Sequence, residues 1–464
     1  MSAAARIIIE NRPGEVRACV LDDRDEPLAF RIERETRRSF VGAIVLGRVA
    51  AVRKDLGAAF IDLGSGTDGF LNIKDAPADA VGTPVSEGAG VLVQVTRDAA
   101  GEKGAQLSLG LDIVGSALVL TPGKPGLGLS GRVSDDAVRA RLTALLRDRL
   151  GEGMGLVVRT AAKDMADDEI LGEYAALSAR WDALQTAATS QAVPAVIVAA
   201  PGLAERMIDR YAGPAMHEIL LDDADTAARV QRHIADRALS LPAPVLAANS
   251  ASAFQAAGIE DAFDAALTPV VPLSGGGSLI VSETPAMTTV DVNAGRGAAG
   301  NPERLALETN LQAADALARV LRVRGIGGLI AVDFLKMRED ANRKRVLSAL
   351  AAAFRGDPEN PRVGDFSRFG IVDIVRRSSG PSLASALLEQ AMRPGAETVA
   401  LDALAQIKRS GGSAAVLKAA PAVCAQLDGP LAEIRKTLER RLGFVIRLEP
   451  VPGTGTETFE IESR

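Results

Sequence analysis

Two aspartates and one asparagine are the residues best suited to chemistry. Asp291 and Asn293 close the apolar run TTVDVNAG, and Asp333 closes the run GGLIAVDF. In α/β sheets, ligands gather where the carboxyl ends of strands meet loops, so we expect these side chains to share one cleft. Two carboxylates and an amide oxygen suit Mg²⁺, which would polarise a phosphodiester and lower the pKa of an attacking water.

A single aspartate at a strand end is more often a turn former or a helix cap. Two such residues flank one helix here, and a basic stretch follows: residues 301–380 hold 14 Lys and Arg against 10 Asp and Glu, although the whole chain carries a formal charge of −6. A local excess of cations in an acidic protein indicates a polyanion site. The combination favours a functional site over two separate turns.

Histidines and cysteines are scarce. The chain has only Cys19, Cys424, His217 and His233, with no CxxC pair. Neither a disulfide framework nor a structural zinc site is supported, and a Ser-His-Asp triad would require one of the two histidines. Metal-assisted hydrolysis therefore gains weight.

The first elements that must position these residues are all strands. ARIIIE and EVRACVLDD surround the turn NRPG and predict a β-hairpin, after which the charged stretch RIERETRRS is expected to be a link. From about Val41, five short β-branched runs separated by glycines occupy roughly 70 residues, which is typical of a small OB-type barrel.

An α/β module follows the barrel. SALVLT and GMGLVVRT predict strands, PGKPGLGLSG a loop between them, and Ser134 a cap for the helix DDAVRARLTALLRDRL. The glycines at 126, 128 and 131 have the GxGxxG spacing of a dinucleotide-binding turn, but the acid expected about 20 residues later is missing, so we discard that interpretation. AVPAVIVAA is expected to open a second layer of alternating strands and helices.

Three stretches in the second half of the chain resemble a known family. AMTTVDVNAGRG, then LETNLQAADALARVLRVRGIGGLIAVDF, then FSRFGIVDIVRRSSGPSL, are similar in order and spacing to the DNase I-like catalytic subdomain of the ribonuclease E/G family. The resemblance implies that Asp291 and Asp333 hold the catalytic magnesium. It also implies that Asn293 positions the scissile phosphate or the water.

The resemblance extends over nearly the whole chain and implies a mixed α/β multidomain protein. The expected parts are an RNase H-like subdomain (1–38 and 191–266), an OB-fold RNA-binding domain (39–115), a 5′-end-sensing module (116–190), a DNase I-like catalytic subdomain (267–388) and a small C-terminal domain (389–464).

The resemblance also implies two sets of RNA contacts. Those along the strand match Phe60, Phe70 (after Gly69, in an expected loop) and Lys103; the structural alternatives are a core phenylalanine for Phe60 and a solvated side chain for Lys103. Arg368 is a candidate because of its position downstream of Asp333 on the same expected face, where it would either contact RNA phosphates near the cut or be solvated. Arg376 and Arg377 are further candidates. The pocket for a 5′-monophosphate matches Gly128, Arg159 and Thr160, and the structural alternative for Arg159 is an exposed residue at a strand end.

The chain departs from the family pattern in three ways. Leu63 stands where relatives often have a third aromatic residue, and ASALLEQAMRPG has no cysteine where relatives carry a zinc-binding link. We also expect the protein to lack the long scaffold tail of the larger relatives. Any homo-oligomer is therefore expected to form without zinc.

The sequence thus predicts a cytoplasmic, magnesium-dependent endoribonuclease that cuts single-stranded, 5′-monophosphorylated RNA to 5′-phosphate and 3′-hydroxyl ends. No apolar run is long enough to span a membrane, and no secretory signal pattern opens the chain. The alternative is a catalytically weak RNA-binding paralogue that acts as a regulator or ribosome-maturation factor. A nucleotide-dependent enzyme is less favoured because no P-loop lysine motif is present.

Overall fold

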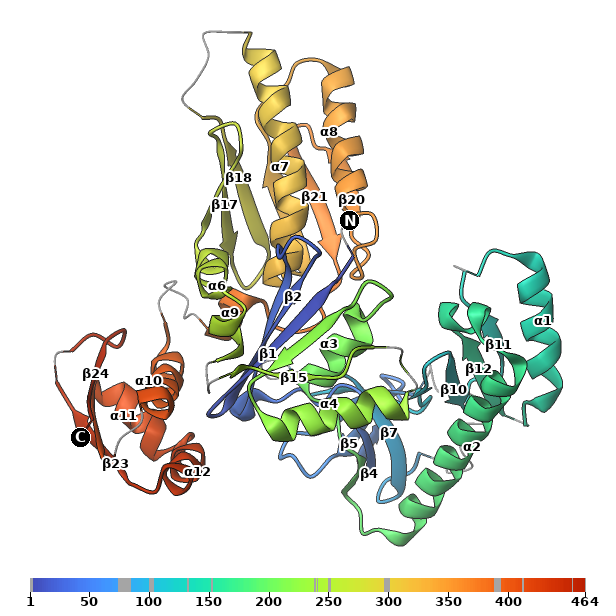
Figure 1. Ribbon diagram of the computed structural model, residues 1–464. Coiled ribbons are helices and arrows are strands. Elements are labelled where there is room, and N and C mark those ends of the chain that lie inside the picture. The colour runs from blue at the N-terminus through green and yellow to red at the C-terminus, as the bar shows by residue number, and fades with distance from the viewer. Residues whose placement is uncertain are drawn as a thin grey trace. The chain divides into compact units, whose positions relative to one another are not determined.

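The computed structural model divides into two compact units (Figure 1). The first comprises Met1–Arg38, Leu203–Gln231 and Leu241–Arg464, and the second comprises Ser39–Gly202 and Arg232–Ser240. The structure describes residues 3–73, 85–99, 104–131, 133–151, 153–237, 239, 241–248, 252–295, 301–387, 394–410, 413–452 and 454–463.

The first unit opens with a five-stranded sheet in the order β15-β14-β1-β2-β3. The predicted hairpin is confirmed, since β1 and β2 pair antiparallel on either side of the turn at Gly14, whose φ is +73°. The elements are β1 (Arg6–Arg12), β2 (Glu15–Leu21), β3 (Pro27–Arg34), the 3-10 helix η1 (Glu35–Arg37), α3 (Leu203–Tyr211), β14 (Glu218–Leu221), α4 (Ala224–Asp236), β15 (Val245–Leu246), α5 (Ala253–Ala256) and α6 (Glu260–Leu267).

The prediction that the charged stretch RIERETRRS is a link was wrong, because its first half belongs to strand β3. Pairing of the charges explains this. Arg34 Nε donates to Glu15 on the neighbouring strand at 2.9 Å, and Arg206 on α3 donates to Glu33 at 2.8 Å. Glu15 and Arg34 can therefore be buried in this sheet because they form an ion pair with each other.

A six-stranded sheet, in the order β16-β17-β18-β19-β21-β20, carries the two candidate aspartates. One face packs on α7 and α8, as Figure 1 shows, through alternate side chains such as Val290, Val332 and Ile374. The opposite face is left free of these helices. The elements are β16 (Val270–Pro272), β17 (Ser278–Glu283), β18 (Thr288–Asn293), α7 (Pro302–Arg324), β19 (Gly328–Asp333), α8 (Asp340–Ala353), β20 (Arg362–Phe366) and β21 (Ile371–Arg376).

The last part of the first unit is a small α/β domain. Its three-stranded sheet has the order β23-β22-β24, and its helices enclose a separate apolar core that includes Leu404, Leu417 and Leu427. The elements are α9 (Leu383–Leu387), which precedes the domain, α10 (Ala396–Ser410), β22 (Ala415–Ala419), α11 (Pro421–Asp428), α12 (Ala432–Leu442), β23 (Ile446–Pro450) and β24 (Phe459–Ser463).

The second unit contains a closed barrel of five strands. The sheet order is β13-β4-β5-β6-β8-β7, and a further pairing of β4 with β7 closes the ring. Val196, expected in a second α/β layer, lies instead on β13, which pairs with β4. The strands are β4 (Ile44–Arg53), β5 (Ala58–Asp62), β6 (Gly69–Asn72), β7 (Gly90–Arg97), β8 (Gln106–Ser108) and β13 (Ala195–Val198).

The remainder of the second unit is an α/β module on a four-stranded sheet in the order β11-β12-β10-β9. Asp135, rather than the predicted Ser134, caps the first helix, because its carboxylate accepts hydrogen bonds from Ala137 N and Val138 N. The elements are β9 (Ile113–Val114), β10 (Leu118–Pro122), β11 (Gly126–Leu129), α1 (Asp136–Leu146), the 3-10 helix η2 (Arg147–Arg149), β12 (Met154–Val158), the 3-10 helix η3 (Thr160–Asp164) and α2 (Asp167–Ser190).

The observed architecture is mixed α/β, and its closed five-stranded barrel is compatible with the predicted OB fold. Among the helices that the structure describes, none combines the length and apolarity required to cross a bilayer.

Candidate active site

The acid pair owes its position to the alternation of side chains along two strands. In β18, Val290 and Val292 are buried against the helices while Asp291 faces the free side of the sheet. In β19, Val332 is buried and Asp333 is exposed. Since successive side chains of a strand point to opposite faces, the burial of the valines fixes the direction of the acids.

The pairing register places the two acids next to each other. Strands β18 and β19 are parallel, and Asp291 is the direct partner of Asp333. Neighbouring strands lie about 4.8 Å apart, so both carboxylates leave the same small area of the sheet. Asn293, which is two residues beyond Asp291 and on the same face, donates a hydrogen bond from Nδ2 to Asp291 Oδ2 at 2.7 Å. The three side chains singled out by the sequence are brought together.

The charges of this pair are not neutralised within the described part of the chain, where neither carboxylate forms an ion pair. Two adjacent carboxylates repel each other unless a cation or a proton lies between them. No group of three or more His, Cys, Asp or Glu side chains with metal-site geometry occurs among the described residues. Two carboxylates fit Mg²⁺, which usually keeps several waters and uses only one or two protein carboxylates.

Asp373 is a third exposed acid on this face that the sequence argument missed. It lies on β21 opposite Ala331, and the next outward position on β21, Ile371, is the partner of Asp333. Gly364 on the edge strand leaves room for it, since a Cβ atom there would lie 2.5 Å from Asp373 Oδ1. The alternation in FGIVDIV is the signal that could have revealed it.

The arginines that follow behave differently from one another. Arg368 is exposed in the turn between β20 and β21, and its guanidinium carbon lies 4.6 Å from the centre of the Phe369 ring. Arg376, a candidate for RNA contact, is instead buried and donates two hydrogen bonds to Asp357 and one to the carbonyl of Ile326. With all these donors used inside the fold, Arg376 has a structural role, and its prediction was wrong.

The two barrel phenylalanines form one surface feature. Phe60 on β5 and Phe70 on β6 are register partners, and their ring centres lie 6.1 Å apart with planes at 76°. Phe70 lies in a strand rather than in the expected loop and is 36% exposed, and Phe60 is partly exposed beside it. Phe60 is therefore not a core residue of the barrel. Lys103 lies outside the described residues.

The residues predicted to form a 5′-phosphate pocket lie at adjoining strand ends of the α/β module. Gly128 belongs to β11, which replaces the predicted loop and pairs in parallel with β12, and Arg159 and Thr160 directly follow β12. The Thr160 hydroxyl lies 3.1 Å from the hydroxyl of Ser130, a polar neighbour that the sequence argument did not select. Arg159 donates from Nη1 to the carbonyls of residues 115 and 116. The predicted pocket therefore contains two neighbouring hydroxyl groups, those of Thr160 and Ser130.

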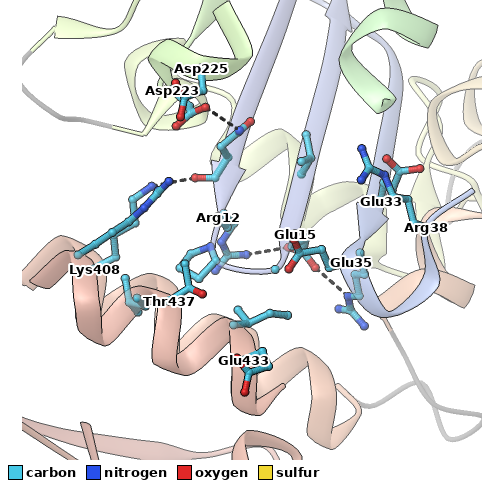
Figure 2. A pocket seen from close by; sticks show the side chains of 18 of the residues that line it. Arg12, Glu15, Glu33, Glu35, Arg38, Asp223, Asp225, Lys408, Glu433 and Thr437 are labelled. Carbon is cyan, nitrogen blue, oxygen red and sulfur yellow. Dashed lines mark hydrogen bonds and ion pairs between the residues drawn. The ribbon is translucent and has the colours of Figure 1, made fainter. Parts of the chain in front are cut away.

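A cavity of about 780 Å³ lies elsewhere in the first unit, between the β1–β2 turn and α12 (Figure 2). Its walls are charged but largely paired. Glu15 accepts from Arg12 and Arg34, and Lys408 donates to the carbonyl of Asn11 at 2.9 Å. The sequence argument singled out none of its residues, and the pairing indicates a junction that holds the C-terminal domain.

Comparison with known proteins adds the family. The model of the ribonuclease E/G family matches residues 112–379, which include both aspartates and the residues predicted to form the 5′-phosphate pocket. Ribonuclease G of Escherichia coli is 27% identical over 485 aligned positions, covering 98% of this chain and 99% of its own length. Ribonuclease G of Haemophilus influenzae is 28% identical and covers 83% and 82%.

Ribonuclease E of Escherichia coli is 33% identical over 358 residues, which are 73% of this chain and 34% of that longer protein. Two exposed acids side by side on parallel strands are an arrangement that a metal-dependent hydrolase could use. The family match is more specific. The chain belongs to the ribonuclease E/G family, a family of endoribonucleases, so the predicted family and enzyme class are confirmed.

Proposed function

We propose that this chain is a magnesium-dependent endoribonuclease that hydrolyses single-stranded RNA internally and leaves 5′-phosphate and 3′-hydroxyl ends. The observation that supports this most strongly is the direct register of Asp291 with Asp333 on parallel strands. The two acids are exposed, adjacent and without a cationic partner among the described residues. Such a site favours a divalent cation and a phosphate oxygen over an internal salt bridge.

Asp291 and Asp333 would hold the metal ion, and the amide of Asn293 would orient Asp291. When bound, Mg²⁺ supplies Lewis-acid polarisation of the phosphodiester. The hydrogen bond from Asn293 Nδ2 occupies one oxygen of Asp291 and leaves its other oxygen available. In this arrangement Asn293 fixes the rotamer of a ligand, and its remaining amide N–H is available to a phosphate oxygen.

The RNA strand would use two surfaces of the second unit. The paired rings of Phe60 and Phe70 offer a platform for base stacking, which contributes about 1–3 kcal/mol per base. Gly128, Arg159 and Thr160 would recognise a 5′-monophosphate, with the Ser130 hydroxyl beside Thr160. Lys103, and Arg368 in the first unit, would contribute phosphate contacts.

The domain layout expected from the resemblance is part of this proposal. The hairpin sheet of β1–β3 with β14 is assigned to the RNase H-like subdomain, and the sheet of β16–β21 to the DNase I-like catalytic subdomain. Both cysteines are free and buried, so we propose that any homo-oligomer rests on protein surface and not on zinc.

The test is cleavage of a 5′-monophosphorylated, 3′-end-labelled RNA with and without magnesium. We expect internal cuts only with magnesium, and fragments that ligate to an adaptor without prior phosphorylation. Asp333→Asn should be inactive, while the control Asp315→Asn, an exposed acid on α7, should cut like the parent. Binding without cutting by the parent would instead support the catalytically weak paralogue.

A further inference from the structure

A groove next to the acid pair includes Arg368, but the rest of its lining has not been assigned a function. It is a cavity of about 940 Å³ in the first unit, bounded by the segment after β19, the turn between β20 and β21, the start of α7 and one arginine of α8. Phe334, the residue after Asp333, is part of its wall. The groove therefore begins where the catalytic strand ends.

The lining of the groove is strongly basic. Four cations and one acid line it, and the acid, Glu303, accepts hydrogen bonds from Arg338 N, Glu339 N and Asn342 Nδ2, which lower its pKa. The carboxylate of Glu303 is therefore already used in hydrogen bonds within the fold. Lys336 and Arg338 are exposed, and neither side chain forms an ion pair within the described ranges. The cations of the groove are Lys336, Arg338, Arg343 and Arg368.

An aromatic ring stands at the rim of this basic groove. Phe369 is 69% exposed, and the Arg368 guanidinium lies 4.6 Å from the ring centre. A planar cation beside an exposed ring is a combination that proteins use to stack nucleic-acid bases, since every base has a π-face and the cation adds attraction. Burial in the fold does not explain this ring, whereas stacking on a base would.

The distances along the chain connect the groove to the site of the cut. Lys336 is three residues beyond Asp333, so the two Cα atoms lie at most about 11 Å apart. On the other wall, Phe369 is two residues before Ile371, the direct partner of Asp333. Both walls thus lie within a few nucleotides of a phosphodiester held at the acid pair.

We propose that this groove binds the nucleotides of single-stranded RNA that flank the scissile phosphate, with one base stacked on Phe369 and backbone phosphates at Lys336 and Arg338. This inference rests on the proposed function for the position of the cut, but the binding itself does not require catalysis. The mixture of a free ring and separate cations favours RNA over an acidic peptide, because a peptide carboxylate gains nothing from the ring.

The experiment measures binding of a fluorescent single-stranded RNA to the full-length Asp333→Asn protein without divalent cations, at several salt concentrations. We expect Phe369→Leu, which keeps the apolar area and removes the ring, to weaken binding about tenfold, and Phe369→Trp to restore it. In a plot of the logarithm of the binding constant against the logarithm of the salt concentration, the double variant Lys336→Ala with Arg338→Ala should reduce the steepness of the slope by about 1.4. Each phosphate contact on a single strand contributes about 0.7 to this salt slope. Lys344→Ala, an exposed cation on α8 outside the groove, is the matched control and removes one charge of the same kind.

Two further readouts separate the possible failures. RNA that carries a photoreactive uridine should cross-link to the segment 367–370, and an acidic peptide should not compete for the groove. Affinity, salt slope and cross-links equal to those of the Lys344→Ala control would overturn the groove proposal, whatever the activity of the parent. Competition by the peptide without any effect of the Phe369 variants would also overturn it. Failure of the parent to cut RNA would contradict the proposed function alone, because the binding measurements do not depend on cleavage.

Discussion

Acids lie near both ends of strands β19 and β21, but they differ in burial and in pairing with a cation. At one end, Asp357 is fully buried and accepts two hydrogen bonds from the buried Arg376. At the other end, Asp333 lies exposed beside Asp291, and no cation among the described residues pairs with either of them. One end of the sheet therefore lies beside an acid that is paired within the fold, and the other end carries two acids that are left for a ligand. This difference separates a structural role from a functional one better than residue type does.

The largest effect is expected at the exposed pair. Asp333→Asn should lower the rate of RNA cleavage by about a thousandfold or more, because the Lewis-acid contribution of a metal is worth several kcal/mol. The free energy of unfolding should change by less than about 0.5 kcal/mol, since the side chain is exposed. Single-turnover cleavage and urea unfolding check the two parts. A variant that is as active as the parent, or one that is strongly destabilised, would break the comparison.

At the buried pair the pattern should be reversed. Asp357→Asn leaves the Arg376 guanidinium buried without its countercharge, so we expect a loss of about 3–5 kcal/mol in the free energy of unfolding. RNA cleavage per folded molecule should stay near the parent value at low temperature. Urea unfolding and kinetics on the folded fraction test this. A stability equal to that of the parent would show that Arg376 does not depend on this partner.

The same comparison can be made between two arginines, Arg159 and Arg376. In contrast to Arg376, Arg159 donates from one nitrogen, Nη1, to backbone carbonyls, and no hydrogen bond from Nε or Nη2 occurs within the described residues. We expect Arg159→Ala to slow cleavage of 5′-monophosphorylated RNA about ten- to a hundredfold, the cost of losing one charge-assisted contact of about 1.5–3 kcal/mol. Cleavage of 5′-hydroxyl RNA should barely change.

The measurement compares kcat/KM on one RNA sequence with three different 5′ ends. Equal loss of activity on all three ends would mean that Arg159 supports the fold through the carbonyls of residues 115 and 116 and does not sense the end.

Asp222 provides an intermediate case, an acid that is buried without an ion pair. Burial raises its pKa to about 6, although the backbone amides of Asn11 and Ala253 donate to it. Because the folded state holds the proton more tightly than the unfolded state, this group favours folding at low pH, and the contribution is lost as pH rises from about 4 to 6. The loss should be about 1–2 kcal/mol after allowance for partial solvent exposure.

The check is the difference in the free energy of unfolding between the parent and Asp222→Asn. Relative to the variant, the parent should lose stability from pH 4.5 to pH 6.5 and change little above that range. A difference that is constant with pH would show that Asp222 titrates normally in the folded protein.

The sequence predicted that both aspartates face outward because that direction depends on local rules, whereas their side-by-side placement depends on the pairing of β18 with β19. Alternation in TTVDVN and LIAVD buries the valines and turns the aspartates outward, whatever the rest of the chain does. The closed barrel was predictable for the same reason, from short strands separated by glycines. Residues whose positions depend only on the period of one strand are accessible to such reasoning.

The wrong predictions concern residues whose structure depends on contacts with residues far away in the sequence. The RIER segment is part of a strand because Glu15 and Arg206 pair with its charged side chains. Arg376 is buried because it forms an ion pair with the buried Asp357. The glycines of β11 form a strand because β12 offers a parallel edge, which outweighs their weak strand propensity. Apart from Arg368, the residues of the basic groove were missed, since they come from a loop, a turn and the ends of two helices that only the fold brings together.

The central claim is that Asp291 and Asp333 together hold the catalytic divalent cation. Its most direct test is a titration with Mn²⁺, followed by electron paramagnetic resonance, of the parent and of Asp291→Asn and Asp333→Asn, with Asp315→Asn as the control. We expect one site in the parent and in the control, displaced by Mg²⁺, and at least a tenfold loss of affinity in each acid variant. Unchanged Mn²⁺ affinity in both acid variants would contradict the claim.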